Sequence, residues 1–155
     1  MSTIEKALQI AAQAHEGQRD KQGMPYILHP LRVMAGVTGE EAQIVAILHD
    51  VIEGTTITIE DLRHAGFSRR ILNAMQCITH RKDMPYAAYV IGCKGNEIAR
   101  QVKLSDLADN TRLERIPFRP DKIDRDSARL RRYFLSYKFL TDQITEEQYV
   151  ALMES

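Results

Sequence analysis

Apolar residues recur at three- and four-residue spacing along most of the chain, which is the pattern of amphipathic helices. Near the N-terminus Ser2 and Glu5 form a capping-box pattern, and Ile4, Leu8 and Ala11 follow on one face. Glycine, proline and cap-forming residues separate the other periodic segments. The predicted helices cover residues 2–15, 30–37, 40–53, 58–66, 69–79, a segment from 85, 96–113, 124–142 and a segment from 145. No alternating pattern predicts a strand, so we expect an all-α bundle of about eight helices.

The composition is that of an ordinary globular domain, with 44% hydrophobic and 27% charged residues among 155. A chain of this length typically forms one domain, here 1–155. No apolar stretch reaches the roughly 20 residues of a membrane span, and the N-terminus lacks a secretory pattern. Cys77 and Cys93 have no CxxC spacing, which indicates reduced thiols. We therefore expect a cytoplasmic protein without a membrane partner.

The charges balance over the whole chain but not along it. The formal net charge is zero, which argues against nucleic acid as a partner. Residues 100–138 nevertheless hold 11 basic and 6 acidic side chains, an excess of +5. This excess fits either a solvated helix face or a basic rim that binds a phosphorylated small molecule. The pattern sets no oligomeric state.

A histidine and an aspartate, His49 and Asp50, end the almost wholly apolar run 42–48. Such a run predicts a buried helix, and titratable groups are rarely buried without a partner. Imidazole and carboxylate are both metal ligands. The doublet therefore indicates a cation site at the end of a core helix.

Two further residues are candidate partners for that cation. His29 precedes Pro30 at a predicted helix start, and Asp106 interrupts an apolar stripe in the helix 96–113. Either residue could instead be a local feature, His29 near a helix start and Asp106 in a cap or an ion pair. Together with His49 and Asp50 they give two imidazoles and two carboxylates without a thiolate. This set disfavours structural zinc and suits manganese or another octahedral divalent ion.

Four segments carry a resemblance to a known family. They are 14–18 (AHEGQ), 23–30 (GMPYILHP), 48–55 (LHDVIEGT) and 102–106 (VKLSD), with Asn110 and Arg112 after them. In order, spacing and identity they resemble the HD-domain metal-dependent phosphohydrolases, and among these the hydrolase domain of the RelA/SpoT enzymes of the stringent response. The likeness covers about 11–133 and is strongest to small free-standing alarmone hydrolases such as the metazoan SpoT homologue. We expect one such domain and no synthetase domain.

The resemblance implies an enzyme and assigns its residues. His29, His49, Asp50 and Asp106 would hold Mn²⁺, and a metal-activated water would remove the 3′-pyrophosphate of (p)ppGpp, a small phosphorylated nucleotide. Glu53 matches the catalytic glutamate that orients or deprotonates this water. The residues that match substrate-binding positions are Lys21, Lys82, Asn110, Arg129 and Tyr133. For Arg129 and Tyr133, a helix face packed on the core is an equal interpretation.

Two residues depart from the family pattern. The family usually has Glu-Asp after the doublet, where this chain has Glu53 and Gly54, and an arginine where it has Asp20. A carboxylate facing pyrophosphate would repel it. The departures keep three alternatives open: a hydrolase of another nucleotide such as NADPH, a degenerate module that binds a nucleotide without turnover, and a helical scaffold with an accidental motif.

Overall fold

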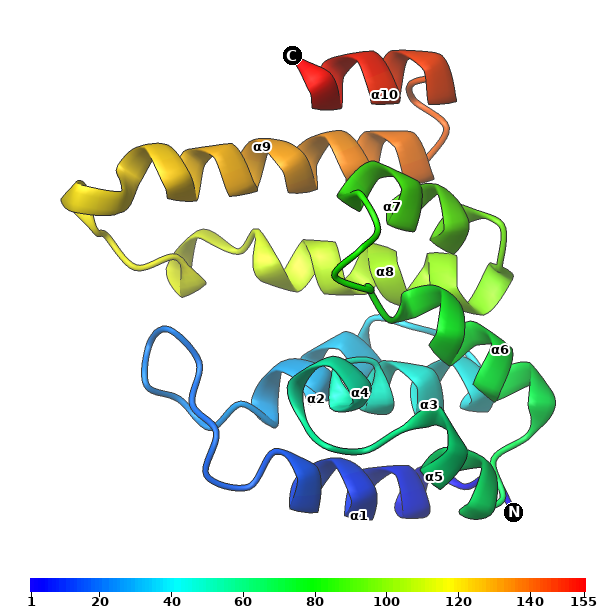
Figure 1. Ribbon diagram of the computed structural model, residues 1–155. Helices are drawn as coiled ribbons and strands as arrows, with labels where there is room; N and C mark the ends of the chain where they lie inside the picture. The colour runs from blue at the N-terminus through cyan, green and yellow to red at the C-terminus, as the bar shows by residue number, and fades with distance from the viewer.

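The computed structural model describes all 155 residues as helices joined by loops (Figure 1). The helices are α1 (Ile4–Ala14), α2 (Leu28–Ala35), α3 (Glu40–Leu48), α4 (Val51–Gly54), α5 (Ile59–His64), α6 (Arg69–Ile78), α7 (Tyr86–Lys94), α8 (Glu97–Asn110), α9 (Ile123–Leu140) and α10 (Glu146–Glu154). Two 3₁₀ turns, Leu113–Arg115 and Pro120–Lys122, connect α8 to α9. The only β-type pairing is an isolated bridge between Arg19 and Pro25. The all-α prediction is confirmed, with ten α-helices where about eight were expected.

Helix α3 lies at the centre of the molecule. It contacts α1, α2, α6 and α8, and its residues from Ile44 to Leu48 are fully buried. In Figure 1 α1 to α5 form the lower part of the bundle, and α7 to α10 stack above them. The loop 18–25 and the segment 111–122 lie at the same end of the bundle (left in Figure 1). The predicted core helix thus lies at the centre of the molecule, and the buried His49 follows its last residue.

The helix predicted over 40–53 is interrupted at the doublet. Helix α3 ends at Leu48, and Asp50 adopts φ −99° and ψ −2° before α4 begins at Val51. The apolar pattern continues through Val51 and so hides the break. As a result His49 and Asp50 form a corner between two helices, and their side chains need not follow one helical face.

Other predicted boundaries differ by a few residues. Thr3, not Ser2, caps α1 by accepting from the Lys6 amide, because the Ser2 hydroxyl accepts from the Ser68 amide instead. Helix α2 begins at Leu28, which places His29 in its first turn, and α8 ends at Asn110, not at residue 113. The side chains of Thr58, Ser68, Asn96 and Thr145 cap the helices that follow them.

A close approach between α2 and α8 brings two candidate ligand-bearing helices together. A Cβ atom on Gly36 would lie 2.3 Å from the Ser105 hydroxyl oxygen, so only glycine fits this packing. The Ser105 hydroxyl donates to the Val33 carbonyl at 2.8 Å. This contact fixes His29 on α2 relative to Asp106 on α8. Nowhere does the chain form a helix with the length and apolarity that a bilayer crossing requires.

Candidate active site

A cavity of about 570 Å³ opens between the lower and upper helices. Nine of the ten predicted site residues line it: Lys21, His29, His49, Asp50, Glu53, Asp106, Asn110, Arg129 and Tyr133. Lys82 does not line it and is exposed in the loop between α6 and α7. One cavity therefore gathers residues from the loop 18–25 and from α2, α3, α4, α8 and α9.

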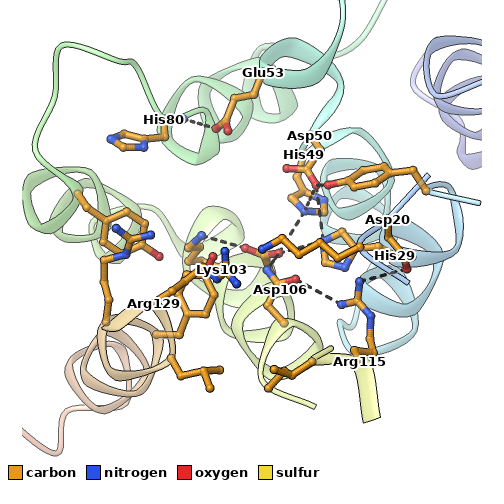
Figure 2. Close-up of a pocket in the computed structure, with 18 of the residues that line it drawn as sticks. Asp20, His29, His49, Asp50, Glu53, His80, Lys103, Asp106, Arg115 and Arg129 are labelled. Carbon is orange, nitrogen blue, oxygen red and sulfur yellow. Dashed lines mark hydrogen bonds and ion pairs between the residues drawn. The ribbon is translucent and has the colours of Figure 1, made fainter. Parts of the chain in front are cut away.

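The four predicted metal ligands converge at the floor of this cavity, as Figure 2 shows. Nε2 of His29 lies 3.5 Å from Oδ2 of Asp50 and 3.0 Å from Oδ1 of Asp106. Nε2 of His49 lies 3.2 Å and 3.4 Å from the same two oxygens. We call these four side chains the cage. His29, His49 and Asp50 have ligand atoms within 4.8 Å of one another, close enough for one divalent ion, and Asp106 faces both imidazoles.

The outer nitrogens of both imidazoles are already bonded. Nδ1 of His29 bonds Oδ2 of Asp109 at 2.6 Å, and Nδ1 of His49 donates to the Ala46 carbonyl at 2.6 Å. Such bonds fix the tautomer that presents an Nε2 lone pair to a metal. Nε2 of His49 is buried and makes no hydrogen bond, although it lies near two carboxylates. A buried nitrogen without a partner is what a metal ligand should be, so the residues present fit a divalent ion.

Neighbouring side chains hold the cage carboxylates in place. The Tyr26 hydroxyl donates to Oδ2 of Asp50 at 2.5 Å. Asp106 accepts from the Lys103 ammonium at 2.9 Å and from the Asn110 amide at 2.9 Å. Asn110, predicted to contact substrate, thus also orients a ligand. Burial would raise the pKa of Asp50, but the nearby imidazole of His49 outweighs burial and lowers it to about 2.

Asp109 connects the cage to the cavity wall. Its carboxylate accepts from Nε of Arg32 at 2.8 Å and from Arg115 at 2.7 Å, in addition to its bond with His29. Burial would raise the pKa of Asp109, but these three partners hold it well below its usual range. The same Arg115 lies 3.8 Å from Asp20.

Glu53 lies beside the cage on α4. The backbone N–H of His80 donates to its carboxylate, as drawn in Figure 2. Burial raises the pKa of Glu53, the opposing bond from His80 notwithstanding. A carboxylate with a raised pKa is a better proton acceptor from water at neutral pH than an ordinary glutamate.

The basic residues of the cavity differ in whether they form ion pairs with acidic side chains. Arg129 and Arg119 both donate to the buried carboxylate of Asp126, Arg129 at 2.8 Å. Lys21 makes no ion pair, and burial together with the nearby charges of Arg129 and Arg119 lowers its pKa. Tyr133 lies 6.4 Å, centroid to centroid, from the ring of Tyr86. Lys21 is therefore the freer of the two predicted phosphate-binding cations.

The two departures from the family pattern have structural explanations. Asp20 accepts from the backbone amides of Gln22 and Met24, so its carboxylate folds the loop and faces Arg115. Gly54 lies outside the main cavity, and a Cβ atom there would meet only the His15 ring, at 3.9 Å. Neither residue disturbs the cage.

Sequence reasoning assigned no role to four residues that shape the site: Tyr26, Lys103, Asp109 and Arg115. Asp109 lies on the same helical stripe as Asp106, about one turn further along the helix. Tyr26 and Lys103 lie within the matched segments 23–30 and 102–106. Tyr26, Lys103 and Asp109 each bond a side chain of the cage. Arg115 lies beyond α8, in the 3₁₀ turn Leu113–Arg115.

No family model matches the chain. A GTP pyrophosphokinase of Myxococcus xanthus is 48% identical over 67 residues, which are 40% of this chain and 9% of that protein. A guanosine-3′,5′-bis(diphosphate) 3′-pyrophosphohydrolase of Aquifex aeolicus is 28% identical over 121 residues, 70% of this chain and 17% of that protein. One of Danio rerio is 34% identical over 91 residues, 53% of this chain and 49% of that protein. The chain thus spans half or less of the length of these relatives.

A solved structure of a metazoan orthologue of SpoT, described as hydrolysing ppGpp, has the same fold. It aligns with a TM-score of 0.66 and 24% identity, over 99% of this chain and 93% of that chain. The helical architecture expected from the resemblance is confirmed. The predicted likeness to alarmone pyrophosphohydrolases is confirmed by the names of the matched relatives.

Proposed function

We propose that this protein is a metal-dependent phosphohydrolase that removes the 3′-pyrophosphate of (p)ppGpp. The observation that carries the proposal is the cage, whose two imidazoles and two carboxylates lie at the floor of a basic cavity with Glu53 beside them. Relatives named for this reaction match 70% and 53% of the chain. A nucleotide that carries phosphates suits the cavity because Lys21 lies in its wall and forms no ion pair.

We assign His29, His49, Asp50 and Asp106 to hold Mn²⁺. When bound, a divalent ion lowers the pKa of water and offsets phosphate charge in the transition state. Asp109 keeps the His29 ring in the ligating tautomer, and Lys103 neutralises part of the charge of Asp106. A set of nitrogen and oxygen ligands suits manganese, whereas structural zinc sites usually contain thiolates.

Glu53 is assigned as the residue that accepts a proton from the attacking water. Its burial raises its pKa toward the range of a useful general base. The His80 amide fixes the carboxylate so that it need not reorient. Lys21 and Tyr133 bind the nucleotide, and Arg129, held by Asp126, adds positive charge to the same wall.

The test is turnover of ppGpp by purified protein with added Mn²⁺, with GDP and pyrophosphate separated by anion exchange. Glu53→Gln should retain the metal and lose at least 100-fold in rate, roughly the contribution of a general base. His49→Ala should lose both metal and activity. Wild-type turnover no greater than that of His49→Ala would reject the proposal.

A phosphate-release screen over other nucleotides, NADPH included, tests the alternative that the protein hydrolyses a nucleotide other than ppGpp. The degenerate binding module is favoured by Gly54, which removes the second carboxylate after the doublet. That alternative predicts stabilisation by ppGpp without product. Measurable turnover would exclude it, and a metal-free purified protein that binds no added Mn²⁺ would favour the plain scaffold.

A further inference from the structure

Arg132 on α9 is an arginine of the cavity without an acidic partner. Arg115 bonds Asp109, and Arg129 bonds Asp126. The Nε–H groups of Arg132 and Arg115 are both buried without an acceptor, but only Arg132 also lacks an ion pair. A buried guanidinium donor without an acceptor costs free energy unless a bound molecule supplies one.

Tyr86 on α7, next to Arg132, also has a buried polar group without a hydrogen-bond partner. The Arg132 guanidinium lies 4.5 Å from the centroid of the Tyr86 ring, and the Tyr86 hydroxyl is also buried without a partner. Burial raises the pKa of Tyr86 to about 12, so the hydroxyl is a donor at neutral pH. Arg132 and Tyr86 both line the cavity, and each has one buried donor group without an acceptor.

This pair is separate from the cage but connected to it. The Lys103 ammonium lies 5.6 Å from the same Tyr86 ring and bonds Asp106 of the cage. The Tyr86 ring thus lies near both Arg132 and Lys103, and Lys103 in turn bonds the cage. A ligand whose reacting phosphate occupies the cage would reach Arg132 only with a different phosphate group.

We propose that Arg132 and Tyr86 form a second phosphate subsite, which makes the cavity selective for nucleotides with a phosphate beyond the one that the cage binds. The planar guanidinium presents a fork that matches two phosphate oxygens, and the ring beneath holds it in place. The second phosphate is either a 5′-phosphate or the distal phosphate of a 3′-pyrophosphate. This inference rests on the proposed nucleotide substrate.

The test measures affinity by calorimetry with Mn²⁺ present, in the Glu53→Gln background so that no ligand is consumed. The ligands are guanosine 3′-monophosphate, guanosine 3′,5′-bisphosphate and guanosine 3′-diphosphate. We expect one of the two larger ligands to bind about 10- to 100-fold more tightly than the monophosphate, the usual effect of charged hydrogen bonds. The ligand that gains identifies the position of the second phosphate.

Arg132→Gln should abolish this gain and leave affinity for the monophosphate within about twofold. Arg131→Gln is the matched control, because the neighbouring Arg131 is exposed and bonds Ser155 instead. If Arg132→Gln does not fold, Tyr86→Phe removes the hydroxyl alone and should reduce the gain. The subsite is rejected if no second phosphate improves binding, if the gain survives these changes, or if all three ligands weaken equally.

The two proposals can fail separately. Selective binding that depends on Arg132 without turnover of ppGpp by the wild-type protein would reject the hydrolase and keep the subsite. Turnover of ppGpp together with unselective binding would do the reverse.

Discussion

Asp109→Asn tests whether the bonds outside the cage govern metal binding. The Asp109 carboxylate is 5% exposed and accepts from His29, Arg32 and Arg115 at 2.6–2.8 Å. An amide of the same shape has one acceptor oxygen, so at least one cationic donor loses its partner. A buried charged hydrogen bond contributes about 1.5–3 kcal/mol, and breaking a buried ion pair costs about 3–5 kcal/mol.

We expect Asp109→Asn to lower the free energy of unfolding by about 3 kcal/mol. For a protein of this size that corresponds to a fall of roughly 6–12 °C in Tm. Affinity for Mn²⁺ should fall about 10- to 100-fold, because the His29 ring loses the carboxylate that fixes its tautomer. Calorimetric titration with Mn²⁺ and a thermal melt measure the two effects.

Asp142→Asn is the matched control. Asp142 also bonds two cations, Lys94 and Arg100, each at 2.8 Å, but it is 68% exposed and far from the cage in the chain. Its replacement should leave Mn²⁺ affinity unchanged. A folded Asp109→Asn protein that binds Mn²⁺ as tightly as the wild type would refute the reasoning.

The same variant should change how stability depends on pH. Because the partners of Asp109 outweigh its burial and depress its pKa in the folded state, its contribution is fully present above the unfolded pKa of about 3.9. The contribution is lost as pH falls below that value toward the folded pKa. The difference in unfolding free energy between wild type and Asp109→Asn should therefore shrink below about pH 4, as urea titrations would show. A difference that grows in acid would contradict the assignment.

Two further changes test the packing and the cage. Gly36→Ala should destabilise the protein by about 1–3 kcal/mol in a urea titration, since its Cβ would overlap the Ser105 hydroxyl; Gly92→Ala, inside α7 with no atom within 4 Å of the added Cβ, should instead be neutral or stabilise by up to about 1 kcal/mol. Tyr26→Phe removes the donor to Asp50 and should weaken Mn²⁺ binding about tenfold while Tm without metal changes little; unchanged affinity would show that this hydroxyl has no part in orienting the ligand.

Sequence predicted the helices and the cage because both leave a local pattern. Helices show in periodicity, and ligands show where a titratable residue interrupts it, as at His49 and Asp106. The interruption of the helix at Asp50 could not be predicted, since Val51 continues the apolar pattern. Helix ends and caps differed where a nonlocal partner competes, as Ser68 does for Ser2.

The substrate-binding residues were less predictable, because a basic residue in sequence does not reveal its partner. Arg129 and Arg132 lie on one helix, yet only Arg129 has an aspartate three residues before it in bonding reach. Lys82 occupies a loop whose direction depends on how α6 meets α7. Asp20 looked repulsive to phosphate, whereas its Oδ1 accepts from two backbone amides and its Oδ2 faces Arg115.

The contacts from His29 through Asp109 and Arg115 to Asp20 end in the loop that carries Lys21. The predicted metal ligand His29 is thus connected by polar contacts to Asp20, the sequence neighbour of the predicted phosphate-binding residue Lys21. Ion and nucleotide are then coupled ligands, and coupling between two binding equilibria is reciprocal. If the proposed Mn²⁺ raises the affinity for the nucleotide by some factor, the nucleotide raises the affinity for Mn²⁺ by the same factor.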